Sequence, residues 1–318
     1  MVAAVWVIAS GFTSETGLLN VACDPTRELW RELNEQFQTR RGVKVRMSHG
    51  GSSSQARSVI DGLAADVVSL ALWSDTDAIR RVGLIDEGWE DRLPDRSLAY
   101  TSTIVFVVRK GNPKNIHDWP DLARPGVAVI TPNPKTSGNG KWSFLAAFGS
   151  VLVRGGDETH AEEFVTRLIR NAPVMDTAAR AATMTFSQKG IGDVHLTWEN
   201  EAHLEVEENP DLIIVYPPVS VLAEPHVAAV DAINRRRGNE AIVRAYLEYL
   251  YTDEAQDIIA RHHHRPTRPS AWERHKDKFP SVEMFRVTRI APDWDELQRR
   301  FFAEGALFDR IITGGRGR

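Results

Sequence analysis

The sequence has very little cysteine, no excess of positive charge and no long apolar run beyond its N-terminus. Its single cysteine, Cys23, cannot form an intramolecular disulfide or a cysteine-based zinc site. The 39 Lys and Arg are balanced by 43 Asp and Glu, for a net charge of -4, which gives no support for a nucleic-acid-binding protein. No later segment approaches the roughly 20 apolar residues of a membrane-spanning helix. At 318 residues, the chain is long enough for one large domain or two lobes.

The first 17 residues allow two interpretations. The run 2–8 is apolar, like the core of a signal peptide, but no Lys or Arg precedes it and no Ala-x-Ala pattern occurs before residue 20. We therefore expect either a weak export signal or an N-terminal tail in residues 1–17. Lipidation at Cys23 is disfavoured, because Asn20 is a poor residue three positions upstream and Cys23 is expected to end a strand.

Three polar turns have the composition of anion-binding sites. They are CDPTRE (23–28), HGGSSSQ (49–55) and TSGNG (136–140), and each stands between a strand-like run and a helix-like one. A helix N-terminus exposes unpaired NH groups and carries about half a unit of positive charge. Three such turns directed at one point would offset about 1.5 units of negative charge without any Lys or Arg. Any one turn is also what an ordinary strand–helix junction requires, but three together favour a shared anionic ligand.

Strands and helices alternate over the first part of the chain. Apolar runs at 18–23, 43–47 and 65–72 predict strands, and the segment 27–37 between them has helical spacing of its apolar residues. Asp24 before Pro25 has the pattern of a helix N-cap. Ser52 with Gln55 has that of a capping box, in which the hydroxyl bonds back to its own helix. This β-α-β-α-β order predicts an α/β sheet.

The same alternation restarts after residue 102 and predicts a second α/β unit inserted into the first. The further strands are expected at 103–108, 127–130, 194–198 and 212–222, and the further helices at 144–148, 161–171, 240–261 and 293–304. Long strands near 101–110 and 212–222 would cross between the units. The predicted boundaries are a tail at 1–17, a first lobe at 18–101 and 218–265, and a second lobe at 102–217 and 266–318.

With these segments in view, residues 18–312 resemble the periplasmic sulfate-binding proteins of bacterial ABC importers. The resemblance rests on the order and spacing of eight short motifs: DPTRE (24–28), HGGS (49–52), ADVV (65–68), RKGNP (109–113), NPKTSG (133–138), DTxAR (176–180), GIGDV (190–194) and WENEA (198–202). It implies a two-lobed, type II periplasmic-binding-protein fold with a ligand cleft between the lobes. It also implies a periplasmic or extracytoplasmic monomer without cofactor or metal, which passes sulfate, or a related oxyanion such as thiosulfate, to a membrane permease.

The resemblance also implies a set of ligand-binding residues. In that family, main-chain NH groups, a serine hydroxyl and a tryptophan indole hold a dehydrated sulfate between the lobes. Carried over to this sequence, the NH donors are Asp24, Ser52, Gly138, Asn139 and Ala179, the hydroxyl is Ser137, and the indole is Trp198. The Asp24 carboxylate would cap its own helix, and Arg180 would support the loops from behind. Asn139 replaces the usual Gly, which we expect the site to tolerate because only its NH is needed.

Two other functions use the same residues differently. Ser137 could be the nucleophile of a hydrolase or transferase, but the G-x-S-x-G context is missing and no His has a defined pairing with it. An effector-sensing domain of a regulator would share the fold, but no helix-turn-helix segment precedes it here. A run of three histidines, 262–264, could bind a metal ion, although a solvated helix end is the simpler expectation.

Overall fold

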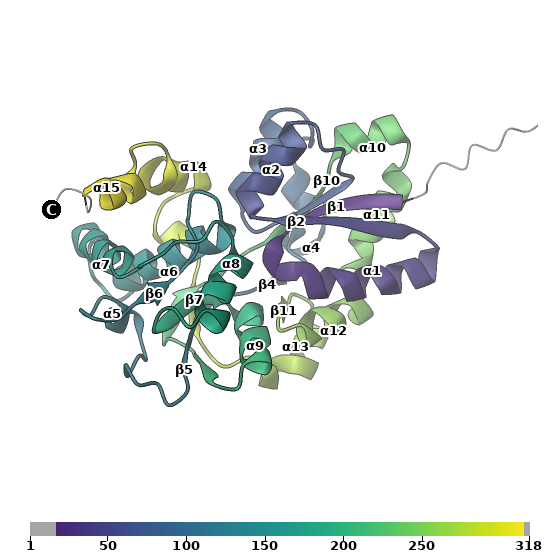
Figure 1. Ribbon diagram of the computed structural model, residues 1–318. Coiled ribbons are helices and arrows are strands. Elements are labelled where there is room, and N and C mark those ends of the chain that lie inside the picture. Colours follow the sequence, from purple (N-terminus) through teal and green to yellow (C-terminus); the bar gives the residue numbers. More distant parts are fainter. Residues whose placement is uncertain (1–16, 315–318) are drawn as a thin grey trace, which may run out of the picture.

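The computed structural model describes residues 17–314, so the predicted export signal or tail lies outside the described residues apart from Gly17. These residues form two lobes, each built on a four-stranded sheet with helices on both faces, which lie side by side in Figure 1. The predicted two-lobed α/β fold is therefore confirmed.

The sheet of the first lobe has the strand order β10-β3-β1-β2. Its strands are β1 (Gly17–Cys23), β2 (Lys44–Gly50), β3 (Val67–Leu70) and β10 (His226–Ala229). β1 is parallel to both β2 and β3, so the carboxyl ends of these three strands meet at one edge. The helices around it are α1 (Arg27–Arg41), α2 (Ser52–Ile60), α3 (Trp73–Arg81), α10 (Asp231–Arg237), α11 (Glu240–Tyr249) and α12 (Asp253–Arg261).

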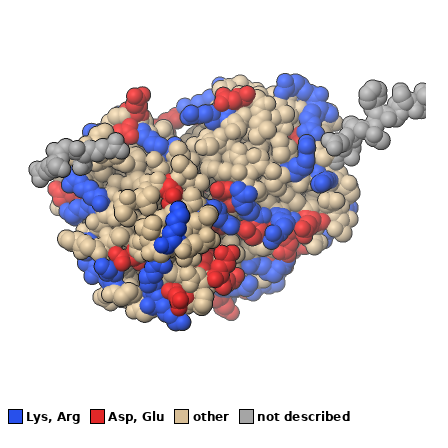
Figure 2. All heavy atoms as spheres, in the orientation of Figure 1, with Lys and Arg blue, Asp and Glu red and all other residues tan. Residues whose placement is uncertain are grey.

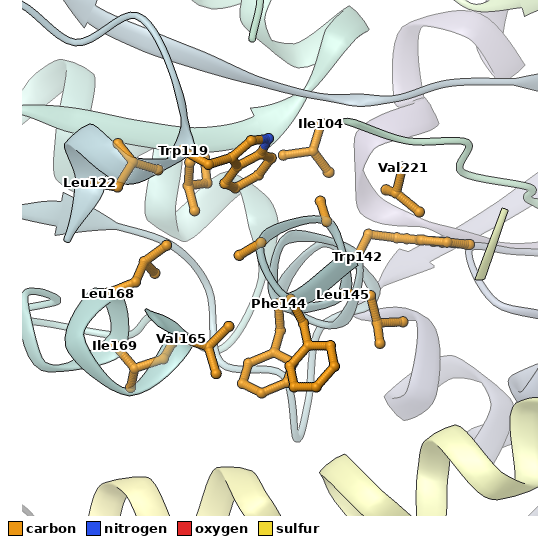
Figure 3. Packing of buried hydrophobic residues seen from close by; sticks show 14 of the residues in the cluster. Ile104, Trp119, Leu122, Trp142, Phe144, Leu145, Val165, Leu168, Ile169 and Val221 are labelled. Carbon is orange, nitrogen blue, oxygen red and sulfur yellow. The ribbon is translucent and has the colours of Figure 1, made fainter. Parts of the chain in front are cut away.

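The sheet of the second lobe has the order β6-β7-β5-β8. Its strands are β5 (Ile104–Arg109), β6 (Val129–Ile130), β7 (Val194–Trp198) and β8 (Leu212–Val215), and its helices include α6 (Gly138–Val153), α7 (Glu158–Arg170), α8 (Ala179–Thr183) and α9 (Glu199–Glu208). Helix α6 is buried almost all round, because both α7 and the strand β9 (Val219–Val221) pack against it. In Figure 3, Trp142 and Val221 lie on one side of α6, and Leu168 and Ile169 of α7 lie on the other.

Shorter elements connect and complete the lobes. They are α4 (Pro94–Ser97), α5 (Trp119–Leu122), α13 (Pro269–His275), α14 (Trp294–Leu297), α15 (Leu307–Gly314), and the strand pairs β4 (Tyr100–Thr101) with β11 (Arg265–Pro266) and β9 with β12 (Glu283–Phe285). The chain crosses between the lobes where Ser102 and Ala223 exchange two main-chain hydrogen bonds of 3.0 and 2.9 Å. This paired crossing gives the lobes a common pivot.

Two predicted helices are divided in the structure. The helix expected at 240–261 is interrupted at Thr252, whose hydroxyl accepts from the NH of Ala255 and so starts α12 as a separate helix. The helix expected at 293–304 begins as α14 but continues as a π-helical turn over Gln298–Phe302.

The surface carries charges of both signs. Figure 2 shows Lys and Arg interspersed with Asp and Glu over the face in view. Within residues 17–314, no helix is both long enough and apolar enough to cross a membrane.

Candidate functional site

The two predicted turns of the first lobe follow adjacent parallel strands. Cys23 at the end of β1 pairs with Gly50 at the end of β2, so Asp24 and Ser52 come from the same edge of the sheet. The next strand, β3, joins them there, because the NH of Ala71 donates to the Ser52 hydroxyl over 3.0 Å. The edge where the strands end is thus fixed by direct hydrogen bonds between its turns.

Ser52 is the first residue of α2, and Gly51 is the N-cap. Its hydroxyl donates to Oδ2 of Asp75 over 2.6 Å. The predicted capping box is therefore wrong: Gln55 turns instead to Ser48, to whose hydroxyl it donates over 3.1 Å. Since the first NH groups of a helix have no acceptor within the helix, the main-chain NH of Ser52 keeps the capacity to bind a ligand.

Asp24 begins a 3-10 turn, Asp24–Thr26, directly before α1. Its carboxylate makes no cap to either helix but pairs with the Arg27 guanidinium at 2.5 Å. The expected cap was wrong because Arg27, three residues on, lies within reach and attracts the carboxylate more strongly than an NH does. The pairing offsets the negative charge of Asp24 next to a proposed anion site.

In the second lobe, Ser137, Gly138 and Asn139 form the start of the 16-residue helix α6. The Ser137 hydroxyl caps the helix by accepting from the NH of Gly140 at 3.4 Å, so its own O–H proton stays available for donation. Asn139 is helical and has none of the positive φ that favours glycine, so its place in the usual glycine position costs no strain. Its Nδ2 is buried without a hydrogen-bond partner among the described residues.

The turns of the two lobes are in direct contact. A Cβ added to Gly138 would lie 2.6 Å from the Cβ of Ala71 and 3.2 Å from that of Ser52, and one added to Gly51 would lie 2.6 Å from the carbonyl oxygen of Thr136. Trp142 spans the same gap, with its indole NH donating to the carbonyl of Ala71 over 2.8 Å. The structure therefore has the lobes closed on each other at these turns.

Ala179 and Trp198 complete the predicted set. Ala179 is the first residue of α8, which packs against the turn Asp24–Thr26 of the other lobe. Trp198 ends β7, is 2% exposed, and lies at a steep angle to Trp142 with ring centres 6.5 Å apart. Its indole Nε1 has no acceptor among residues 17–314. A buried donor without an acceptor is costly unless a ligand supplies one.

Arg180, which follows Ala179 in α8, links the two lobes next to the predicted ligand-binding residues. Its guanidinium pairs with Glu28 of α1 at 2.5 Å and with Glu201 of α9 at 2.8 Å. Partial burial acts to raise the pKa of Glu28, but the hydrogen bond and charge of Arg180 outweigh it and lower that pKa. Full burial raises the pKa of Glu201 to about 8, against the opposing effect of Arg180. The sequence prediction included Arg180 but neither partner, although both glutamates stand within the motifs DPTRE and WENEA.

A further contact across the cleft lies on the same side. The Asn200 side chain donates to the carbonyl of Pro25 over 2.7 Å and is buried. Together with Arg180, it ties the turn after β1 to the segment after β7.

The structure gives little support for Ser137 as a nucleophile or for a metal site at the histidine run. Among the described residues, the NH of Gly140 is the hydrogen-bond partner of the Ser137 hydroxyl, and no histidine hydrogen-bonds to it. No group of three metal-ligating side chains occurs in the part of the chain that the structure describes. His264 is only 2% exposed and packs edge-on against Tyr100, so the expectation of a solvated histidine run is wrong for this residue.

The arrangement is therefore a cradle of helix N-termini and buried donors between two closed lobes. Comparisons with known proteins agree with it. Residues 18–265 match the family described as bacterial extracellular solute-binding protein. The chain is 48% identical over 303 residues to the sulfate-binding protein of Salmonella typhimurium, covering 92% of each chain, and 47% identical over 305 residues to the thiosulfate-binding protein of Pseudomonas aeruginosa, covering 93% of this chain and 92% of that one.

Solved structures show the same similarity in three dimensions. The sulfate-binding protein SubI from Mycobacterium tuberculosis superposes with a TM-score of 0.84 at 32% identity, over 90% of this chain and 99% of that one. A ferric binding protein from Campylobacter jejuni, with a TM-score of 0.67 at 17% identity over 92% of this chain and 99% of that one, shares the fold.

Proposed function

Because this chain belongs to the bacterial extracellular solute-binding proteins, we propose that it captures sulfate outside the cytoplasm and delivers it to an ABC permease. The observation that carries this proposal is the contact between Ser52 and Gly138, two helix N-termini from different lobes. The protein is a binding protein rather than an enzyme, and its ligand is an oxyanion of the sulfate and thiosulfate class.

We propose seven ligand contacts: the main-chain NH groups of Asp24, Ser52, Gly138, Asn139 and Ala179, the hydroxyl of Ser137, and the indole NH of Trp198. Burial of these residues and their positions at helix starts support this set. At about 1.5–3 kcal/mol for each hydrogen bond to a charged group, seven contacts give a gross gain of roughly 10–20 kcal/mol. Dehydration of the anion and ordering on closure offset much of this, which is compatible with micromolar or tighter affinity.

Selectivity follows from a site that only donates. Sulfate is fully ionised at neutral pH and has no proton to place. Hydrogen phosphate would direct its P–OH at a donor, and an unmade buried polar contact costs about 1–3 kcal/mol. The proposed set therefore prefers sulfate, and accepts thiosulfate for the same reason.

The closed arrangement gives the binding motion. An anion that contacts both lobes favours the closed state, because its interactions are complete only when the lobes meet. Opening about the Ser102–Ala223 crossing would release it to the permease.

We keep the predicted lobe boundaries as a proposal with one refinement: β9 packs on α6, so the return to the first lobe is expected between Val221 and His226. We also propose that the protein acts as a monomer.

Thermal unfolding with added oxyanions tests the proposal. A ligand that binds only the folded protein raises the unfolding midpoint, and at a fixed concentration a tighter ligand raises it more. We expect sulfate and thiosulfate to raise the midpoint at constant ionic strength, and phosphate to raise it much less. Equal shifts for all three anions would indicate a general salt effect and contradict the assignment.

A further inference from the structure

A second cavity lies between the lobes, away from the helix starts described above. Its volume is about 250 Å³. Trp73, Arg96 and His226 line it from the first lobe, and Arg286, Thr288 and Trp294 line it from the second. Figure 1 shows the two helices that carry the tryptophans, α3 and α14, facing each other across the gap between the lobes.

The cavity volume of about 250 Å³ is slightly smaller than the roughly 300–1,000 Å³ of pockets that bind drug-sized ligands, so the cavity suits a smaller molecule.

Two indoles line this cavity, one from each lobe, and both are held in place by residues outside the lining. The Nε1 of Trp73 donates to Glu90 over 2.8 Å. Trp294 packs perpendicular to Trp142, with ring centres 5.2 Å apart. Both indoles are only partly buried, so each keeps apolar surface for a further contact. Fixed aromatic faces of this kind favour a flat, apolar ring as the occupant.

His226 adds a buried hydrogen-bonding group to the lining of the cavity. His226 is 5% exposed and packs edge-on against Trp89, and burial, with the charge of Arg96, lowers its pKa to about 3. Its imidazole is therefore neutral at pH 7. Its Nδ1 atom is buried and has no hydrogen-bond partner among the described residues.

Two guanidinium groups that line the cavity, those of Arg96 and Arg286, have N–H donors beyond those used in their ion pairs. Arg96 donates to Glu90 over 2.7 Å, and Arg286 donates to Glu224 over 2.6 Å. Each guanidinium has five N–H groups, so most of them remain open to another acceptor. Because Glu224 and Asp293 also line the cavity, its charges nearly cancel, which disfavours a dianion such as sulfate.

We propose that this cavity binds a small aromatic carboxylate, with its ring between Trp73 and Trp294 and its carboxylate on Arg96 and Arg286. Such a molecule contacts both lobes at once. It therefore binds the closed arrangement better than an open one, and strengthens closure on the anion at the main site.

Benzoate is the probe that tests direct binding, measured by calorimetry or ligand-observed NMR on the sulfate-saturated protein. We expect saturable binding that Thr288→Trp abolishes, because the exposed Thr288 side chain would be replaced by one that fills the cavity. Trp73→Leu should weaken benzoate at least about fivefold through loss of one aromatic wall. The matched control is Trp272→Leu, whose indole stacks on Phe279 outside the cavity, and it should leave benzoate binding unchanged.

Benzamide, which has the same ring without the charge, should bind at least about tenfold more weakly, since the contacts to Arg96 and Arg286 are charge-assisted. Benzoate binding that survives Thr288→Trp, or the absence of saturable binding, overturns the site. Equal binding of benzamide overturns the role of the two arginines.

The coupling to the main site is measured separately and rests on the proposed sulfate function. Saturating benzoate should tighten sulfate about fivefold, and sulfate should tighten benzoate by the same factor, as linkage requires. Benzoate binding without this coupling would overturn the link to closure. If sulfate itself fails to bind, benzoate can still be titrated into the protein alone, so the failure of one site is distinguishable from that of the other.

Discussion

Gly138 and Ala71 approach each other so closely that a Cβ on Gly138 would lie 2.6 Å from the Cβ of Ala71. The two residues come from different lobes, at the start of α6 and just after β3. A methyl group at this point therefore opposes closure of the lobes without entering the core of either one. The presence or absence of a Cβ at residue 138 therefore affects closure of the lobes.

Gly138→Ala should weaken sulfate binding and leave the fold intact. Overpacking costs about 1–3 kcal/mol, which here opposes the closed state alone and corresponds to roughly a 5- to 150-fold rise in the sulfate Kd. Alanine is the better helix former, so the free energy of unfolding without sulfate should not fall. Calorimetry and urea unfolding measure the two effects. Gly314→Ala is the matched control, because a Cβ there meets nothing within 4 Å. Unchanged sulfate affinity in Gly138→Ala would show that closure at this contact is not needed.

Trp198→Phe should remove one ligand donor while keeping an aromatic side chain in place. The Nε1 of Trp198 is buried without an acceptor among the described residues, so its loss costs the protein alone no hydrogen bond. We expect sulfate binding to weaken by about 1.5–3 kcal/mol, with little change in thermal stability of the sulfate-free protein. Sulfate affinity equal to that of the parent would mean that Trp198 serves only the core.

Ser137→Ala separates a hydrogen-bond donor from a nucleophile. We expect sulfate binding to weaken by about 1–3 kcal/mol, because one sulfate oxygen loses its partner. Loss of the cap to Gly140 should also lower stability by about 1 kcal/mol, which unfolding in urea measures. An activated ester should not label Ser137 in the parent protein. A covalent adduct on Ser137, seen by mass spectrometry, would instead support a hydrolase or transferase.

Glu201→Gln should change how stability depends on pH. Burial raises the pKa of Glu201 to about 8 in the folded protein, above its ordinary value of 4.5. The contribution of Glu201 to the free energy of unfolding is therefore fully present below pH 4.5. It is lost as pH rises toward 8, because the Glu201 carboxyl ionises at lower pH in the unfolded chain than in the folded protein. Gln cannot ionise, yet its side-chain oxygen can still accept from Arg180. We expect urea unfolding at pH 5 and pH 8 to show a smaller loss of stability in the variant than in the parent, and an equal loss in both would refute the raised pKa.

The strands were predictable because their signals are local. The apolar runs 18–23 and 194–198 fall almost residue for residue on β1 and β7, since a strand buried on both faces needs a continuous apolar segment. Helix boundaries were harder. The apolar spacing continues through Thr252, and only the hydrogen bond from Ala255 shows that a new helix starts there.

Side-chain partners within the site were the least predictable part. Asp24 and Ser52 both have the composition of helix caps, but each turns to another partner. Asp24 pairs with Arg27, three residues on, and Ser52 donates to Asp75, 23 residues away, which no local pattern reveals. The contact of Arg180 with Glu28 depends on how the two lobes meet. No periodicity along one segment reports such a contact, because it joins residues more than 150 positions apart.

Titration calorimetry with sulfate at constant ionic strength and pH 7 tests the central claim most directly. The account predicts saturable binding of one sulfate per chain with a Kd of about 1 μM or tighter, equivalent to roughly -8 kcal/mol or better. It also predicts that phosphate, in the same buffer, binds at least about tenfold more weakly, since its proton has no acceptor among the proposed contacts. An absence of saturable sulfate binding, or equal affinity for phosphate, would contradict the account.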